Sequence, residues 1–161
     1  MMTLVSTITV GSGGASSIEF TGIPGTGKDL LVLFSLRDSH ASVGVVQATF
    51  NNTAFGTTAR ALIGTGSAVS SINSDPITLG QIPNSSFTSN TFGSGSMHVS
   101  NYAGSTAKSL SIETVTENNA TASEQRITAR RNPDTNPVTI IRLDPFSSFV
   151  QHSTASLYIV S

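Results

Sequence analysis

The sequence predicts an all-β protein, folded as an antiparallel β-sandwich with a jelly-roll-like topology. Apolar and polar residues alternate along most of the chain, and β-branched residues are abundant, as expected for strands that bury one face. Helical spacing of apolar residues is nearly absent. Clusters of Gly, Pro, Asn and Ser recur between the alternating segments, which predicts many short strands joined by turns.

Taken in order, strands are expected at residues 3–10, 16–21, 29–37, 43–50, 58–64, 76–82, 95–100, 107–117, 124–131, 137–143 and 149–160. Most of these segments end at a turn sequence: GSGG, IPGTGK, NNTAFG, GTGS, IPNSS, NYAGST, ENNAT and NPDTNP. The residues of these turns supply positive φ angles, a fixed φ angle or side-chain capping. They therefore fix where each strand stops.

The later segments give more detail. In 107–117 one face carries Leu110, Ile112 and Thr114, and the opposite face carries Ser111, Glu113 and Val115. The segment 137–143 is apolar on both sides, which predicts a central strand. The segment 149–160 is long and apolar up to its end, so we expect it to be held within a sheet.

Composition limits the possible functions. The 161 residues suit one domain, 1–161, in which residues 1–14 are expected to form an N-terminal arm with a Gly-rich hinge. Only 11% of residues are charged, against about 25% in ordinary chains, whereas Ser and Thr together number 47. With 8 Lys and Arg against 9 Asp and Glu, no basic excess favours nucleic acid or an anionic membrane. Cysteine is absent, so no disulfide can form. The sequence shows no signal peptide and no apolar run near the ~20 residues of a membrane span. A soluble chain is therefore expected.

The stretch GIPGTGKD has Gly22, Gly27 and Lys28 at the spacing of a phosphate-binding loop. Such a loop continues with Ser or Thr and opens a helix, whose amides hold the phosphates. Here Asp29 follows, and its carboxylate would repel a phosphate. The next segment alternates like a strand, so the stretch is interpreted as a turn.

Other candidate chemistry is weak. His40, His98 and His152 are too scattered for a zinc motif, and they are interpreted as surface or internally bonded residues. A serine triad with His152 and Asp144 has no sequence support. Glu113 and Glu117 lie about 13 Å apart by strand rise, too far for a glycosidase pair, and a solvated face is expected.

The basic cluster Arg126, Arg130 and Arg131 is interpreted as a solvated edge, although it could also meet a carboxylate of a neighbouring subunit or a phosphate. Three glycosylation sequons, at Asn51, Asn84 and Asn119, match the number expected by chance in so Ser- and Thr-rich a chain.

The sequence also contains a faint internal echo. SIEFTGIPGTGKDLLVLFSLRDS and SMHVSNYAGSTAKSLSIETVTEN both predict a strand, a Gly-containing connector that ends in Lys, and a second strand. Two Greek-key halves of a jelly roll would give such a repeat, and so would any two similar hairpins.

Several stretches resemble small all-β virion structural proteins of tailed bacteriophages of aquatic bacteria. They are SIEFTGIP with DLLVLFSLRDS, NYAGSTAKSLSIETVTENNAT, and FVQHSTASLYIV. The shared pattern is a short strand ending near Pro, a long apolar strand ending in Leu-Arg, an Asn-Tyr turn before a Ser-rich strand, and a last strand finishing near Leu-Tyr. The chain departs from the pattern at GTGK, where an aromatic or plain polar turn is expected.

This resemblance implies a capsid decoration or cement protein: a jelly-roll-like module that stabilises the phage head. Its partners would be the major capsid protein or other virion proteins, and it would act as a homo-oligomer, dimer or trimer. It would be located in the virion after assembly in the bacterial host cytoplasm. The alternative is a tail or neck component, such as a tail-fibre module that binds a receptor or carbohydrate.

The composition agrees with a structural role, because a weakly charged, hydroxyl-rich surface suits repeated subunit contacts. Residues Met1 to Val10 are expected to pair with a neighbouring subunit or with the shell beneath. Sugar sites usually present aromatic rings. This chain has no Trp and only two tyrosines, Tyr102 and Tyr158, so its composition disfavours the carbohydrate alternative. No enzyme activity, catalytic residue, cofactor or metal is expected.

Overall fold

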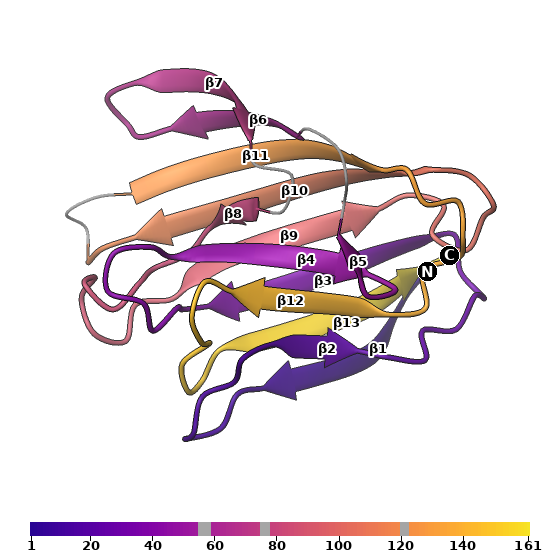
Figure 1. Cartoon of the computed structure of the whole chain (residues 1–161), viewed down its shortest axis with the longest axis horizontal. Coiled ribbons are helices and arrows are strands. Elements are labelled where there is room, and N and C mark those ends of the chain that lie inside the picture. Colours follow the sequence, from indigo (N-terminus) through magenta and orange to yellow (C-terminus); the bar gives the residue numbers. More distant parts are fainter. Residues whose placement is uncertain (55–58, 75–77, 120–122) are drawn as a thin grey trace.

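The computed structural model describes residues 1–54, 59–74, 78–119 and 123–161, which form strands and no helix (Figure 1). The strands are β1 (Met2–Thr9), β2 (Ile18–Phe20), β3 (Asp29–Leu36), β4 (Val45–Phe50), β5 (Thr53–Ala54), β6 (Ala59–Gly64), β7 (Val69–Ser74), β8 (Thr78–Gln81), β9 (Gly93–Val99), β10 (Lys108–Glu117), β11 (Ser123–Asn132), β12 (Ile141–Pro145) and β13 (Thr154–Val160).

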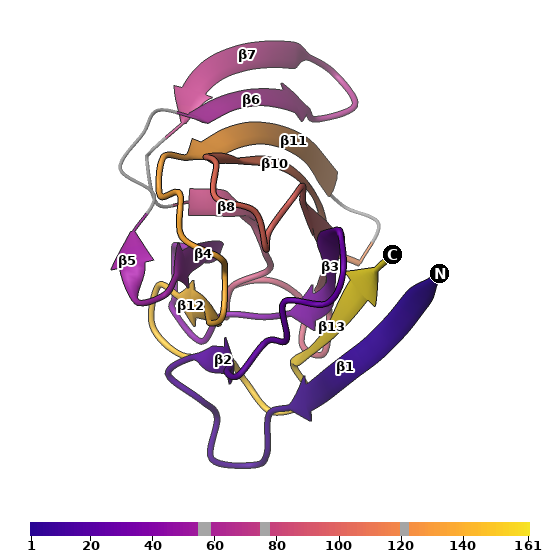
Figure 2. The same ribbon diagram turned by 90° about the vertical axis from the view of Figure 1, so that its right-hand side faces the viewer.

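The strands form two antiparallel sheets. The larger sheet has eight strands in the order β1-β13-β3-β9-β10-β11-β6-β7. The smaller sheet has the order β2-β12-β4-β5, and β8 also pairs with β4. The two sheets pack face to face, so that each has one face toward the core and one toward solvent (Figure 2).

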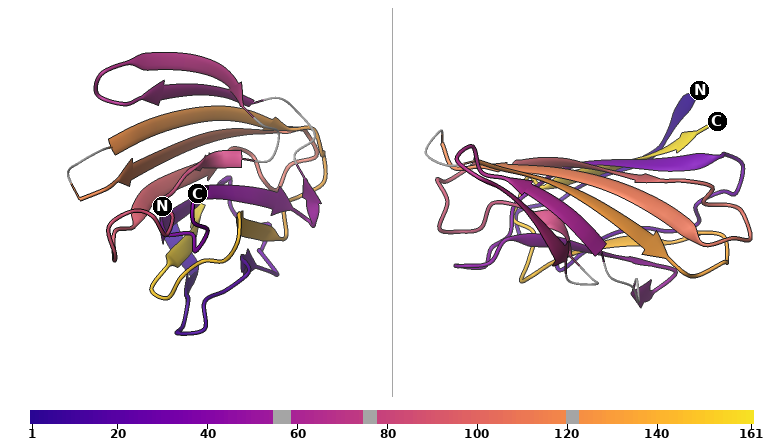
Figure 3. Two further views of the ribbon diagram at one scale, coloured as in Figure 1. Left: turned by 60° about the vertical axis from the view of Figure 1, so that its left-hand side comes forward. Right: turned by 90° about the horizontal axis from the view of Figure 1, so that it is seen from above.

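The larger sheet extends past the smaller one at both edges. At one edge β1 pairs only with β13, and every residue of β1 except Ile8 is exposed. At the other edge the hairpin β6–β7 continues the sheet beyond β8, as Figure 3 shows from two further directions. The chain termini lie side by side, and the amino group of Met1 donates to the carbonyl of Ser161.

The core lies between the two sheets and is built from alternate residues of their strands. Its largest fully buried side chains include Phe50, Phe149, Leu30, Met97 and Tyr102. β12 runs between β2 and β4, and β13 runs between β1 and β3. The predictions of an inner strand near residue 140 and of a last strand held within a sheet are therefore confirmed.

The all-β class and the antiparallel sandwich are confirmed, and most strand boundaries agree within a few residues. The expected strand 137–143 begins only at Ile141, and the expected strand 149–160 begins only at Thr154. The short strands β5 and β7 were not predicted. The expected strands 58–64 and 76–82 begin at residues outside the described part of the chain.

The internal echo does not correspond to a structural repeat. β2 and β3 belong to different sheets, whereas β9 and β10 form a hairpin within one sheet. The two connector lysines also differ, because Lys28 is exposed and Lys108 is completely buried. The interpretation of the echo as two equivalent Greek-key halves, which the sequence left open, is therefore not supported.

Candidate binding surface

The outer face of the larger sheet is the broadest surface that no strand covers. Over β1, β13, β3 and β9 this face carries apolar side chains such as Leu4, Leu33 and Tyr158, and it also carries hydroxyl groups, which are contributed by Thr7, Thr9, Thr154, Ser156, Ser35, Ser94 and Ser96. These side chains alternate with the apolar residues of the core, which places them on the solvent side. A face of this kind can form many hydrogen bonds but concentrates little charge.

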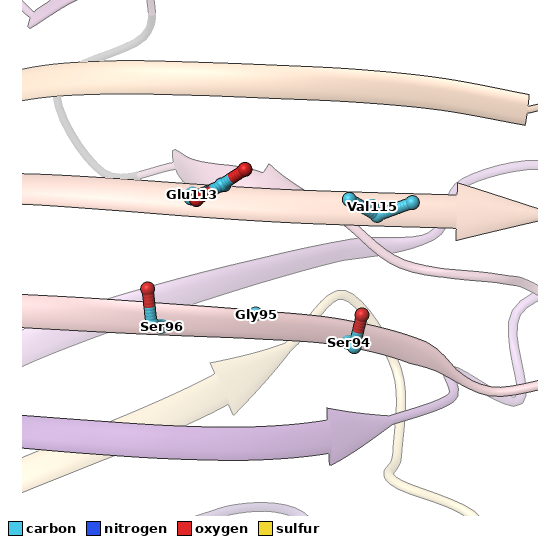
Figure 4. A pocket seen from close by; sticks show the side chains of 5 residues that line it. All are labelled: Ser94, Gly95, Ser96, Glu113 and Val115. Atoms are coloured by element: carbon cyan, nitrogen blue, oxygen red, sulfur yellow. The ribbon is translucent and has the colours of Figure 1, made fainter.

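A shallow hollow of about 250 Å³ interrupts this face between β9 and β10 (Figure 4). Ser94 and Ser96 rise from β9, and Glu113 and Val115 rise from β10. The floor is backbone at Gly95, where a side chain is excluded because its Cβ would lie 2.3 Å from the Phe34 ring on the buried side of the sheet.

The hollow offers two hydroxyls, one carboxylate and one apolar side chain. The Glu113 carboxylate accepts a hydrogen bond of 2.7 Å from Nε2 of Gln125 on the next strand. Neither a second carboxylate nor a histidine lines the hollow to act as a base or nucleophile partner. Its chemistry suits hydrogen bonding to a polar surface, and Glu113 lies on the solvated face that was predicted for it. The side chain of Glu117 lies outside the described part.

The stretch GIPGTGKD forms the turn that the sequence predicted. Lys28 is exposed, and its backbone N–H donates to the carbonyl of Val160 at 2.9 Å. The Gly27 N–H donates to Oη of Tyr102 at 3.2 Å, and that hydroxyl donates to the carbonyl of Pro24. A strand, β3, follows directly, so no helix N-terminus is present to hold a phosphate.

The three histidines lie in separate places. Nδ1 of His40 accepts from the backbone N–H of Val43 at 3.0 Å, and the ring packs edge-on against Phe146. Nε2 of His98 lies 3.4 Å from a carboxylate oxygen of Asp29. His152 is exposed in a turn with a φ of 73°. They are surface or internally bonded residues, as predicted.

The described bonds do not assemble a serine triad from His152 and Asp144. Asp144 accepts a 2.7 Å bond from Nε of Arg142 on the same strand, and the described bonds do not join it to His152. Within the described ranges, the structure contains no cluster of three or more acidic or histidine side chains able to hold a metal ion.

The prediction of a solvated edge was wrong for Arg126 and Arg130. Both point inward from β11 and are only 8% and 4% exposed. Arg126 lies 3.2 Å from a carboxylate oxygen of Glu124, and Nη1 of Arg130 donates to the carbonyl of Thr78 at 3.3 Å. Their register explains this: Arg130 pairs with Leu110, whose face is fixed by the core. Arg131 faces outward and is exposed.

Two further buried charges were not recognised from the sequence. The Arg37 guanidinium donates to the carbonyls of Phe87, Thr88 and Thr91 at 2.8–2.9 Å, which fixes the loop before β9. Burial lowers its pKa from the ordinary value. Asp38, completely buried, accepts from the backbone N–H groups of His40 and Phe146.

Lys108 is a third buried charge that was not recognised from the sequence. Its ammonium donates to the carbonyls of Gly104, Thr106 and Thr135. Burial lowers the pKa of Lys108, and the nearby carboxylate of Asp134 partly offsets that shift. The only sequence signal was the Lys-Ser-Leu start of a strand, which does not distinguish a buried from an exposed lysine.

The strands β10, β11, β6 and β7, which we call the extension, bury more polar residues than the rest of the larger sheet. Their inner face buries Leu110, Ile112, Ala59 and Ala61, and it also buries Thr114, Thr116, Arg126, Thr128 and Arg130. Their outer face exposes apolar residues: Val115, Ile127, Leu62 and Val69, which are 37%, 45%, 53% and 82% exposed. The usual pattern is reversed in β11, and the exposed apolar residues make this outer face a candidate contact surface.

Among the described residues, the structure has no helix of the length and apolarity needed to cross a membrane. A scan against protein-family models and a search of curated proteins both find no match to this chain.

Proposed function

We propose that this protein is a structural component of a phage particle, most simply a decoration or cement protein of the head, and that its framework is a jelly roll. The strand order supports the jelly roll. Eight strands divide into two four-stranded groups, β1-β13-β3-β9 and β2-β12-β4-β8, the order that two Greek keys produce. The strands β5–β7 and β10–β11 are then insertions in the connections of this framework.

The observation that carries the functional proposal is the edge strand β1. Met1 and the β1 residues Met2, Leu4 and Val5 are 91%, 54%, 52% and 37% exposed, and the strand contains no charged residue and no Pro, although its register shifts between Leu4 and Ser6. Exposed edge strands are usually protected by such residues, because an unprotected edge invites pairing with another chain. An uncharged apolar edge suits a protein that attaches to a shell or to a neighbouring subunit.

The alternative, a tail or neck component that binds a receptor or carbohydrate, rests on the hydroxyl-rich outer face and its shallow hollow. Tyr102 is completely buried and supplies no exposed ring to that face. Tyr158 is half-buried, so the face is poor in the aromatic platforms that sugars prefer. The decoration role is therefore preferred.

Antibody labelling of purified virions tests the proposal. A decoration protein gives dense labels over the head at high copy number. Labels confined to the tail tip support the adhesion alternative, and unlabelled virions contradict both. In a binding assay with particles stripped of the protein, Leu4→Lys should weaken attachment, whereas Thr9→Lys, also exposed and at the far end of β1, serves as the matched control.

A further inference from the structure

The extension presents a small apolar centre on its outer face. Ile127 of β11 and Leu62 of β6 are paired directly in register, so their side chains lie next to each other on that face. Both are about half exposed, at 45% and 53%. The cross-strand partner of Ile127 on its other side is Glu113, and the partner of Ala129 on β6 is Arg60.

Two opposite charges therefore flank this apolar centre. Glu113 lies on β10 and Arg60 on β6, about 12 Å apart when strand spacing and residue rise are combined. Both side chains are exposed. Arg60 makes no ion pair with the described acidic residues, and Glu113 makes none with the described cations. Their separation is too large for them to pair within one chain.

We propose that the outer face of the extension binds the same face of a second copy of this chain. The two copies are related by a two-fold axis that runs between the two faces, parallel to them, and passes midway between Glu113 and Arg60. The axis brings Glu113 of each copy onto Arg60 of the other. It also places Ile127 of one copy against Leu62 of the other, twice. The two sheets then cross at a steep angle, close to the orthogonal arrangement of packed sheets.

The second copy is the preferred occupant because the surface is complementary to itself. An isologous contact requires that every residue on one side of the axis meets its complement from the other side. Glu113, Arg60 and the apolar pair between them satisfy this condition without any additional partner, and Arg131, also exposed on β11, lies beyond Ala129 at the rim of the contact. The contact also covers the apolar side chains that β11 and β6 leave exposed.

This inference rests on the proposed function, since it names how subunits of that protein associate. The two are separable by experiment. A chain that stays monomeric while antibodies still decorate the virion contradicts the dimer alone. A dimer that never appears on the virion contradicts the proposed function alone.

Sedimentation velocity of the full chain over a range of concentrations provides the test. The natural chain should dimerise. Glu113→Arg places two arginines in contact, and Arg60→Glu places two glutamates in contact, so each variant should raise the dimer Kd at least tenfold. The double variant restores both ion pairs and should recover the dimer. Glu19→Arg and Lys28→Glu, exposed charges outside the extension, are the matched controls and should leave the Kd unchanged.

Mixing the two single variants gives the sharpest result. A heterodimer of Glu113→Arg with Arg60→Glu has attractive pairs at both contacts, so the mixture should dimerise although neither variant does so alone. A natural chain that is monomeric throughout, or variants that all behave alike, would overturn the proposal. A double variant as weak as the single variants would overturn it as well.

Discussion

The two halves of the larger sheet differ in what they bury. In β13, β3 and β9 the inner face is apolar, with Leu157, Val32 and Met97 all at 0% exposure, and the outer face carries hydroxyls beside apolar residues such as Leu33. In β11 the inner face carries Thr128 and Arg130, and the outer face carries Ile127. β10 lies between these two patterns, because its Leu110 and Ile112 belong to the core.

Two physical requirements, backbone hydrogen bonding and the removal of apolar side chains from water, are met differently in the extension. Continuing the sheet satisfies its backbone hydrogen bonds regardless of side-chain character. Its exposed apolar residues, Val115, Ile127, Leu62 and Val69, are on the side away from the core of this chain, where only another molecule can remove them from water. The first half therefore supplies more of the core than the extension does, although Leu110 and Ile112 of β10 belong to that core, and the outer face of the extension offers a surface for association.

The largest expected effect compares the same substitution in the two halves. Leu157→Ala should lower the free energy of unfolding by about 2–5 kcal/mol, because it leaves a cavity in a filled core. Leu62→Ala should change it by only about 0.5 kcal/mol, because that side chain is exposed in the isolated chain. Urea titration at dilute, monomeric concentration measures both. Equal losses would show that Leu62 is packed as tightly as a core residue and would contradict its role in a contact surface.

The next largest effect is expected at Arg37, a buried charge with hydrogen-bond partners. Arg37→Met should cost about 1–3 kcal/mol, since it leaves carbonyls of the loop before β9 without donors. Arg142→Met is the control, because Arg142 is only half-buried and pairs on the surface with Asp144. Thermal unfolding of both variants decides this, and a loss in the control as large as in Arg37→Met would contradict the role given to Arg37.

Thr128 lies on the inner face of the extension, and we expect its replacement to raise the free energy of unfolding rather than lower it. Its Oγ1 is buried with no hydrogen-bond partner in the described part of the chain. Thr128→Val replaces that hydroxyl with a methyl group of similar size and should raise the free energy of unfolding by about 1 kcal/mol. The control Thr116→Val changes a buried threonine of β10 on the same inner face. A marked loss in Thr128→Val alone would mean that its hydroxyl has a bonded role.

The smallest expected effect is a pH dependence from Lys108, where the extension begins. Its pKa in the folded state is lowered below the ordinary 10.5. Between the two values the unfolded state holds more protons, so stability should rise with pH through this window. The cost of burying the ammonium is fully present below the folded pKa. Urea titrations from neutral pH to about 10.5 should show this rise for the natural chain relative to Lys108→Met, and parallel curves would contradict it.

The fold could be predicted because period-two alternation covers most of the chain. β7 was missed because its apolar residues, Val69 and Ile72, are three apart and break that period. β5 has only two residues and carries no pattern. The expectation for Arg126 and Arg130 was wrong because the register of β11 with Leu110 and Ile112 of β10 decides which side chains of β11 point inward. The residue pattern of a single strand does not reveal this register.

The contact surface could not be predicted from the sequence for the same reason. Glu113, Ile127, Leu62 and Arg60 become neighbours only through two strand pairings, β10 with β11 and β11 with β6. By contrast, the turn character of GIPGTGKD was decided locally by Asp29 and by the strand that follows. Local chemistry was predictable, and cross-strand assembly was not.

Chemical cross-linking of a single introduced thiol tests the central claim most directly. The chain has no cysteine, so Ala129→Cys supplies one thiol beside the proposed two-fold axis on the outer face of β11. A short bismaleimide should then join two copies into a covalent dimer, whereas Ser35→Cys, on the outer face of β3, should remain monomeric under the same conditions. Equal reaction of both thiols with a monofunctional maleimide, together with no excess of dimer from Ala129→Cys, would contradict the account.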